Sequence, residues 1–448
     1  MILLKNIFYL VRDSLRIEKN IDLLIDGNRI KQIGRINSKN PQNNIEVLDC
    51  KNKAVIPGLI NAHTHLWQSM LKGRRDDLSL VPWCEQVIYP FIQVLREQVK
   101  YTRASEIGYL WSMLGAIEMI RAGITSFVDM DSGYFAERVP QAWLDIGIRG
   151  VFSVEMVDKW VPDNIRIDPK HEKENILKLI DAWHKYSRGE PLIKVAMSAS
   201  APFTCSEELL SWILEQSNKY NLAIQIHVSE TKWEVEQCLR NIGKTPLKYL
   251  ESIGFLYRPI MAVHCVHLTD EEIKIAKKHS VSVIYNPKSN MKLGSGIAPI
   301  TKMLKEGVNV ALASDGTASN DLMDLFEEMR VGAMLQKVAH EDPAVFSAQE
   351  IFSIATEGGA KACQIDAGKI DEGKLADITI INLSSPHIFT LSDDIIPALV
   401  YCAKGDDVET VIINGNIIMQ NKQIMTIDEQ MIVKEIEKIS KKLKNDLK

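Results

Sequence analysis

Short apolar runs typical of β-strands recur along the middle of the chain and alternate with helical patterns. Eight such runs begin with VIPGLINAHTH and end with VNVALASDG. The segment EIGYLWSMLGAIEMIRAG has apolar residues at helical spacing and ends at Gly123, and Thr269 with Glu272 forms a capping-box pattern at the start of another helix. Eight strand–helix units of this kind predict an α/β fold, a (β/α)8 TIM barrel over residues 57–367.

Both ends of the chain carry β-rich patterns. IDLLIDGNRIKQIG turns at residues 26–28, and VETVIINGNIIMQNK turns at residues 414–416. Two β-rich ends predict one small β-sandwich domain, built from residues 1–56 and 368–448, that brackets the barrel. From about Asp428 the chain is rich in Lys and Glu, which predicts a C-terminal helix with a solvated face.

Composition limits the class of protein. The 448 residues are 46% hydrophobic and 25% charged, with a formal net charge of −5, so the sequence is typical of a globular protein without a nucleic-acid footprint. Lys5 and Arg12 interrupt the apolar N-terminus, so no signal peptide is expected, and no run of about 18 apolar residues predicts a membrane span. Seven scattered cysteines without a CxxC pair favour a cytoplasmic location over a disulfide framework.

Polar residues gather where the apolar runs end, which in a barrel is the face that holds the active site. The first run ends with His63 and His65, whose i, i+2 spacing places both imidazoles on one side of a strand. The fifth run ends with His227 and the eighth with Asp315. Taken singly, each is as readily a buried histidine or a turn residue, but together three imidazoles and one carboxylate predict a zinc-type metal site.

The motifs PGLINAHTH, HVSET, HCVHL, YNPKSNMKLGSGIAP and ALASDGTASND resemble the amidohydrolase superfamily. More narrowly, they are similar to the branch of adenosine and S-adenosylhomocysteine deaminases, guanine and cytosine deaminases, and s-triazine hydrolases. The resemblance implies one divalent ion, Zn²⁺ or alternatively Fe²⁺, held by His63, His65, His227 and Asp315. Binuclear members use a modified lysine at the end of the fourth strand, where this chain reads SASAP and Lys194 lies near the strand's start.

The resemblance also implies catalytic roles. A metal-activated hydroxide would attack the ring carbon, with Asp315 accepting the proton of the water. Glu230, in an HxxE pattern, would protonate the ring nitrogen, and His264 would orient the water; the alternative for Glu230 is a surface ion pair with Lys232. This chemistry predicts a hydrolytic deaminase of an amino-substituted N-heterocycle (purine, pyrimidine, pterin or triazine) that releases ammonia.

The positions expected to contact substrate do not all favour the same substrate class. Nucleoside deaminases of the branch have a ribose-binding glutamate where this chain has Ile92 and a histidine where it has Ser200, which weakens a nucleoside substrate unless Glu85 substitutes. Gln68 has the spacing at which base deaminases contact the ring, or else it faces solvent at a helix start. Trp83 either flanks a flat ring or packs in the core. Gln68, Trp83 and Ser200 are the predicted substrate contacts.

Other functions stay open at this point. One is a dehalogenase or N-dealkylating hydrolase of a triazine-like ring, and another is an adenosine or S-adenosylhomocysteine deaminase despite Ile92 and Ser200. A catalytically silent binding protein is disfavoured because all four ligands, Glu230 and His264 are present. The expected partner is a small heterocyclic substrate, with no nucleic acid or membrane, and the resemblance favours a homo-oligomer.

Overall fold

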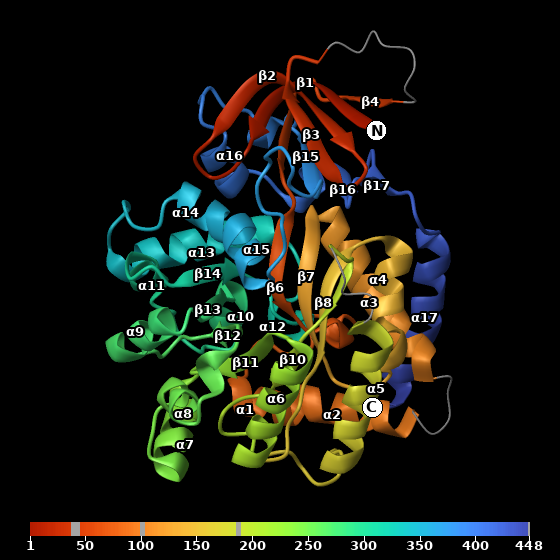
Figure 1. Ribbon diagram of the computed structural model, residues 1–448. Helices are drawn as coiled ribbons and strands as arrows, with labels where there is room; N and C mark the ends of the chain where they lie inside the picture. Colours follow the sequence, from red (N-terminus) through yellow and green to blue (C-terminus); the bar gives the residue numbers. More distant parts are fainter. Residues whose placement is uncertain (37–44, 99–103, 185–189, 447–448) are drawn as a thin grey trace.

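The computed structural model describes residues 1–36, 45–98, 104–184 and 190–446, which form a mixed α/β structure (Figure 1). Among these residues, nine strands from the two ends of the chain make one sheet, here called the mixed sheet. Its strands are β1 Ile2–Val11, β2 Ile17–Asp26, β3 Arg29–Gly34, β4 Glu46–Asp49, β5 Lys53–Pro57, β15 Ile378–Asn382, β16 Val408–Ile413, β17 Asn416–Gln420 and β18 Gln423–Ile424. Their order is β18-β17-β16-β15-β5-β1-β2-β3, with β4 paired to β1.

The two chain ends meet inside the mixed sheet, as the sequence patterns predicted. Strand β15 pairs antiparallel with β5, and the hairpin turns at 26–28 and 414–416 touch each other. The Asn28 side chain donates a hydrogen bond to Asn414 Oδ1 at 3.2 Å. A Cβ atom on Gly415, which has φ +74°, would lie 1.9 Å from the Gly27 carbonyl oxygen, so the turns fit together only with glycine there.

The eight apolar runs form two parallel sheets. The first parallel sheet contains β6 Leu59–Thr64, β7 Ile124–Asp131, β8 Arg149–Val154 and β9 Ile193–Val195. The second parallel sheet contains β10 Met197–Ala199, β11 Ile224–Val228, β12 Ile260–His264, β13 Ser282–Tyr285 and β14 Asn309–Leu312. All neighbouring strands within these two sheets run parallel. The run that opens with VIPGLINAHTH is divided at Gly58, with its first half in the mixed sheet.

The fourth run is likewise divided, and its two halves link the parallel sheets. The Ala196 amide donates to the Phe152 carbonyl of β8, and the next amide, of Met197, donates to the Ala223 carbonyl beside β11. At the other edges of the sheets, the Asp315 amide beyond β14 donates to the His63 carbonyl of β6 at 3.1 Å. The two parallel sheets are therefore in contact at both pairs of edges.

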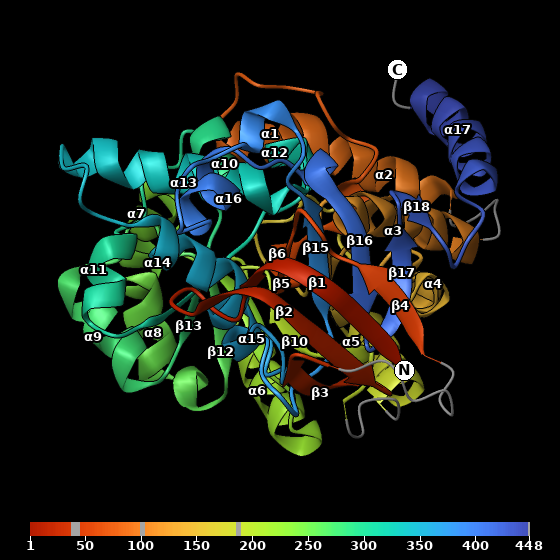
Figure 2. The ribbon, with the colours of Figure 1, turned by 90° about the horizontal axis from the view of Figure 1, so that it is seen from above.

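Helices follow the parallel strands and lie around them, with the mixed sheet at one end (Figures 1 and 2). The longer helices are α2 Tyr89–Gln98, α3 Ala104–Arg121, α4 Val139–Ile146, α5 Pro169–His184, α6 Glu207–Tyr220, α7 Lys232–Ile242, α9 Asp270–Lys278, α13 Leu325–His340 and α17 Glu429–Asp446. The shorter ones are α1 Leu80–Trp83, α8 Pro246–Ser252, α10 Pro287–Lys292, α11 Ile300–Lys305, α12 Thr317–Asn320, α14 Ala348–Ser353, α15 Gly359–Ala362 and α16 Ile396–Tyr401.

Local signals set several of these helix ends. The capping box predicted at Thr269 is present, with the Glu272 side chain accepting from the Thr269 amide. Helix α17 has the predicted solvated face, and its buried Ile432, Ile436 and Leu443 form a stripe at helical spacing on the side that packs against α3. No helix of the described residues is long and apolar enough to cross a membrane.

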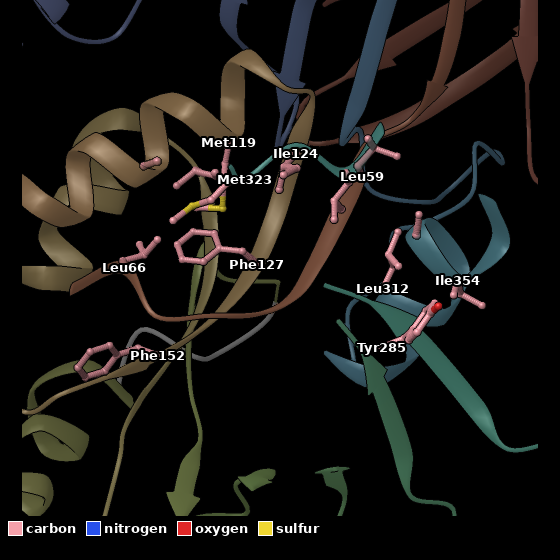
Figure 3. Close-up of a cluster of buried hydrophobic side chains, with 14 of the residues drawn as sticks. Leu59, Leu66, Met119, Ile124, Phe127, Phe152, Tyr285, Leu312, Met323 and Ile354 are labelled. Carbon is pink, nitrogen blue, oxygen red and sulfur yellow. The ribbon is translucent and has the colours of Figure 1, made fainter. Parts of the chain in front are cut away.

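Apolar side chains fill the layer between the parallel strands and the helices. Figure 3 shows Phe127 of β7, Tyr285 of β13 and Leu312 of β14 among them, together with Leu66 from the short 3-10 helix after β6 and Met323 from the loop before α13. All five are buried. One face of each strand packs against this core. The polar residues at the strand ends lie on the opposite face and point into the site described next.

Candidate active site

The polar residues predicted from the strand ends meet in one cavity of about 500 Å³. His65, His227, His264, Glu230 and Asp315 all line it. They lie at or just after the carboxyl ends of β6, β11, β12 and β14, so strands that are far apart in the sequence each contribute a side chain there.

The four predicted metal ligands converge. Ligand nitrogens of His63, His65 and His227 lie within 4.8 Å of one another. Asp315 Oδ1 lies 3.5 Å from His63 Nε2 and 3.7 Å from His65 Nε2. Three imidazoles and one carboxylate therefore surround a common point, as the i, i+2 spacing and the strand ends predicted.

The outer nitrogen of each imidazole is held by an acceptor, which fixes the tautomer and the direction of the ring. The Nδ1 atoms donate as follows: His63 to Gln225 Oε1 at 3.0 Å, His65 to the Met130 carbonyl at 2.8 Å, and His227 to the Ser200 carbonyl at 2.7 Å. Each ring consequently turns an unprotonated Nε2 toward the centre, which is the arrangement that metal-binding histidines adopt.

The donor set fits a divalent metal ion. His63 Nε2 is buried and has no hydrogen-bond partner among the described residues. Its lone pair is therefore available to bind a metal ion. Burial lowers the pKa of His63, His65 and His227, so the three rings are neutral at pH 7. Burial opposes ionisation of Asp315, but His63 and the other nearby histidines bring the pKa of its carboxyl well below the usual range. Neutral imidazoles with one carboxylate are ligands that zinc prefers.

Glu230 lies beside this centre and is 4% exposed, so the alternative of a surface ion pair is wrong. Ser295 Oγ donates to Glu230 Oε1 at 3.0 Å, which leaves Oε2 to carry a proton. Burial and the Asp315 charge raise the pKa of Glu230 to about 7. Glu230 Oε2 lies 3.6 Å from His264 Nε2, and that nitrogen lies 3.9 Å from Asp315 Oδ2. A carboxylic acid, an imidazole and a carboxylate thus face one point.

Backbone strain accompanies two of these residues. His264 and Asp315 have φ of 72° and 65°, in the left-handed region. Such conformations cost about 1–3 kcal/mol each in a residue with a side chain and occur preferentially at functional sites. The strained backbone at the two strand ends sets the direction in which both side chains leave the strands.

Several supporting residues escaped the sequence analysis. Gln225, which holds His63, lies two residues before His227 on β11, so its inward direction followed from strand alternation and the signal was available. Ser289 donates to Asp315 Oδ2 at 2.7 Å, and Asn290 accepts from His264 Nδ1 at 2.9 Å. Both come from the turn that begins α10, and their contacts depend on how that turn folds over the strand ends.

The predicted substrate contacts also line the cavity. Gln68 is 3% exposed, so its solvent-facing alternative is wrong, and a Cβ atom on Gly316 would lie 2.1 Å from Gln68 Oε1. That oxygen has no hydrogen-bond partner among the described residues. Trp83 is buried against the core and faces the cavity, and Ser200 and Ile92 line it as well.

Comparisons with known proteins place the chain in a family. The Amidohydrolase family matches residues 54–418. A 5′-deoxyadenosine deaminase of Methanocaldococcus jannaschii is 42% identical over 98% of this chain and 99% of its own length. A 5-methylthioadenosine/S-adenosylhomocysteine deaminase of Thermococcus sibiricus is 41% identical over 93% of this chain and 94% of its own.

A solved deaminase structure has the same fold as this chain. The crystal structure of an adenosine deaminase of Xanthomonas campestris with bound zinc superposes with a TM-score of 0.90 and 26% identity, covering 99% of this chain and 98% of that one. The predicted superfamily and the predicted reaction class, hydrolytic deamination, are confirmed. The chain belongs to the amidohydrolase family.

Proposed function

We propose that this protein is a metal-dependent deaminase of adenosine-type nucleosides, which replaces the 6-amino group of the purine with oxygen and releases ammonia. The observation that carries the proposal is the complete set of four metal-binding side chains beside Glu230 and His264 in one cavity. The substrate class is supported by the deaminase relatives at 42% and 41% identity.

We further propose that the two parallel sheets close into one (β/α)8 barrel over residues 57–367. The hydrogen bonds at Ala196 and Asp315, which link the sheet edges, support closure. Residues 1–56 and 368–448 would form the β-sandwich. In its support, β1 pairs with β4 along one half and with β5 along the other, and these strands share an apolar cluster separate from the larger one.

We assign one zinc ion to His63, His65, His227 and Asp315. When bound, the ion would lower the pKa of a water molecule and so supply the nucleophile near neutral pH. A single ion is supported by Lys194, whose Nζ donates to the Gln364 carbonyl and does not line the cavity. We also expect a reducing, cytoplasmic location, since all seven cysteines are free.

The chain's own residues supply the proton transfers. Glu230 Oε2 protonates N1 of the purine, which makes C6 electrophilic, while Asp315 takes a proton from the attacking water. His264 Nε2 is unprotonated because Nδ1 donates to Asn290, so it accepts a hydrogen bond from the attacking water and orients that water. The proton held by Asp315 then passes to the leaving amine, the hydroxyl proton on C6 returns to Glu230, and ammonia departs to leave the C6 oxo group.

The rate should depend on pH through Glu230. The acid form carries the proton, and the pKa of Glu230 is raised to about 7, so the active form is complete at low pH and is lost as pH rises through about 7. We expect kcat/KM for 5′-deoxyadenosine to fall on the alkaline side of a profile measured in buffers of constant ionic strength. A kcat/KM that stays level up to about pH 9 would contradict this role for Glu230.

The cavity lining favours a nucleoside whose 5′ end is uncharged. Trp160, Phe203 and Trp233 pack edge to face at its wall, with ring centroids 5.3–6.2 Å apart. Among the described residues that line the cavity there is no Lys or Arg, while Glu85 and Glu155 add carboxylates. A 5′-phosphate would therefore meet like charge without a counterion, whereas a 5′-methyl or thioether group would meet apolar surface.

A substrate panel tests this proposal. We expect 5′-deoxyadenosine and adenosine to be deaminated, and kcat/KM for AMP to be lower by about 100-fold, because close like charges cost several kcal/mol. The measurement is ammonia release at matched concentrations. Guanine turned over fastest would favour the base-deaminase hypothesis drawn from Gln68. Halide release from a chlorotriazine, without deamination of adenosines, would favour the dehalogenase alternative.

A further inference from the structure

A second polar group of side chains lines the cavity away from the proposed catalytic residues. Glu155 follows β8, Glu172 lies in the first turn of α5, and Ser132 follows β7, and all three line the cavity. None of them belongs to the metal ligands or to the proton-transfer groups. The proposed reaction leaves them without a role.

Glu155 offers an unused carboxylate. Among the described residues its side chain makes no hydrogen bond and no ion pair. It nevertheless lines the same cavity as His65 and His227. A negative charge in this position, half-buried and without a cation, has acceptor capacity that a ligand can use.

Glu172 and Ser132 carry orphaned polar atoms. Glu172 is 6% exposed, and its buried Oε2 atom, like Ser132 Oγ, has no hydrogen-bond partner in the part of the chain that the structure describes. Burial, with the charges of Glu155 and Asp158, raises the pKa of Glu172 to about 8, so this carboxyl is protonated and can donate at pH 7. Unpartnered buried polar atoms of this kind are costly unless a ligand or water satisfies them.

We propose that Glu155 and Glu172 bind the 2′,3′-diol of the substrate ribose, an inference that rests on the proposed nucleoside deaminase function. Two vicinal hydroxyls can donate to the two oxygens of one carboxylate, and the protonated Glu172 adds a donor for a hydroxyl oxygen. In 5′-deoxyadenosine these are the sugar's remaining hydroxyls. The pair would take over the role of the glutamate that the branch has where this chain has Ile92.

The inference is tested with Glu155→Gln and two substrates. We expect the variant to lower kcat/KM by about 100-fold for adenosine, mostly through KM, because hydrogen bonds to a charged group are lost. For 2′,3′-dideoxyadenosine, which lacks the diol, we expect wild type and variant to agree within about threefold, as a thermodynamic cycle requires when the partner group is absent. The control is Glu174→Gln, at an exposed position on α5, the helix that carries Glu172. We expect it to leave kcat/KM unchanged for both substrates.

Each other outcome is also decisive. An equal fall in kcat/KM for both substrates, or no fall for either, would overturn the assignment. A fall in kcat/KM that occurs only in Glu85→Gln, and only for the substrate with the diol, would place the diol site at the α1–α2 segment instead. Glu172→Met, which removes the donor, provides a second variant should Glu155→Gln fail to fold; we expect its kcat/KM to fall for adenosine and to stay near wild type for 2′,3′-dideoxyadenosine. If the wild type deaminates neither nucleoside but remains metal-loaded, the proposed function fails, which is a different result from loss of the diol site.

Discussion

Replacement of Glu230 with Gln is expected to lower kcat for 5′-deoxyadenosine by about 10³-fold, within the range that general acid–base catalysis contributes. The substitution keeps the shape of the side chain and its acceptor for Ser295 Oγ, but it removes the proton that Glu230 Oε2 would deliver to N1. Because Glu230 is not among the four proposed metal ligands, metal content should remain that of wild type. The measurement is steady-state ammonia release together with metal analysis of the same sample.

A matched control lies on the next helix. Glu236 on α7 is exposed, and Glu236→Gln should leave both kcat and metal content unchanged. A Glu230→Gln protein that keeps its metal and turns over within about tenfold of wild type would show that another group protonates the ring.

Replacement of His63 with Ala is expected to have the second large effect, on metal binding itself. His63 is fully buried, its ligand nitrogen has no hydrogen-bond partner among the described residues, and its other nitrogen is held by Gln225. Loss of one ligand should weaken metal affinity by more than the 10- to 100-fold typical of changes in the residues behind the ligands. We expect the purified variant to hold little metal and to show about 10³-fold less activity.

Removal of the metal from wild type provides the matching experiment. Chelation should abolish ammonia release, and one equivalent of zinc per chain should restore it. Added zinc should also raise the melting temperature of wild type, because a ligand at about 1,000 times its Kd stabilises the folded state by about 4 kcal/mol. His63→Ala should lose this thermal shift, whereas His279→Ala, at an ion pair with Glu251 on the outer helices, should retain it. Full thermal and catalytic recovery in His63→Ala would contradict the ligand assignment.

Much of the fold could be predicted because its signals are local. Strand alternation at His63 and His65, the turn at residues 26–28 and the capping box at Thr269 all depend on near neighbours in the sequence. The division of the first run at Gly58 and of the fourth run at Ala196 was not predicted. Which sheet a strand pairs with depends on chain segments far away, so a continuous apolar run carries no mark of where its partner changes.

Some residues of the candidate site could likewise be predicted from local sequence, and others could not. The ligands lie at strand ends, where a period of two and the change from apolar to polar residues mark them. Gln225 shares that period and was available to the same reasoning, whereas Ser289 reaches Asp315 only because helix α10 lies beside the end of β14. Glu155 and Glu172 belong to no motif, and only the placement of β8 and α5 around the same cavity brings them together.

The substrate prediction changed most. Ile92 and Ser200 pointed away from nucleosides because they lack the sugar-binding groups found at the same positions in the branch. The relatives at about 40% identity are deaminases of 5′-substituted adenosines, which is why the nucleoside proposal now comes first. Both residues do line the cavity. Their positions in the sequence carry no sign that other strands bring carboxylates to the same cavity.

The central claim is tested most directly by incubating the zinc-loaded protein with 5′-deoxyadenosine and measuring both products. Our account predicts that 5′-deoxyinosine and ammonia form in equal amounts, and that both disappear in Glu230→Gln while its zinc remains bound. A fully zinc-loaded wild type that leaves 5′-deoxyadenosine and adenosine unchanged, yet hydrolyses a free base or a triazine, would contradict it.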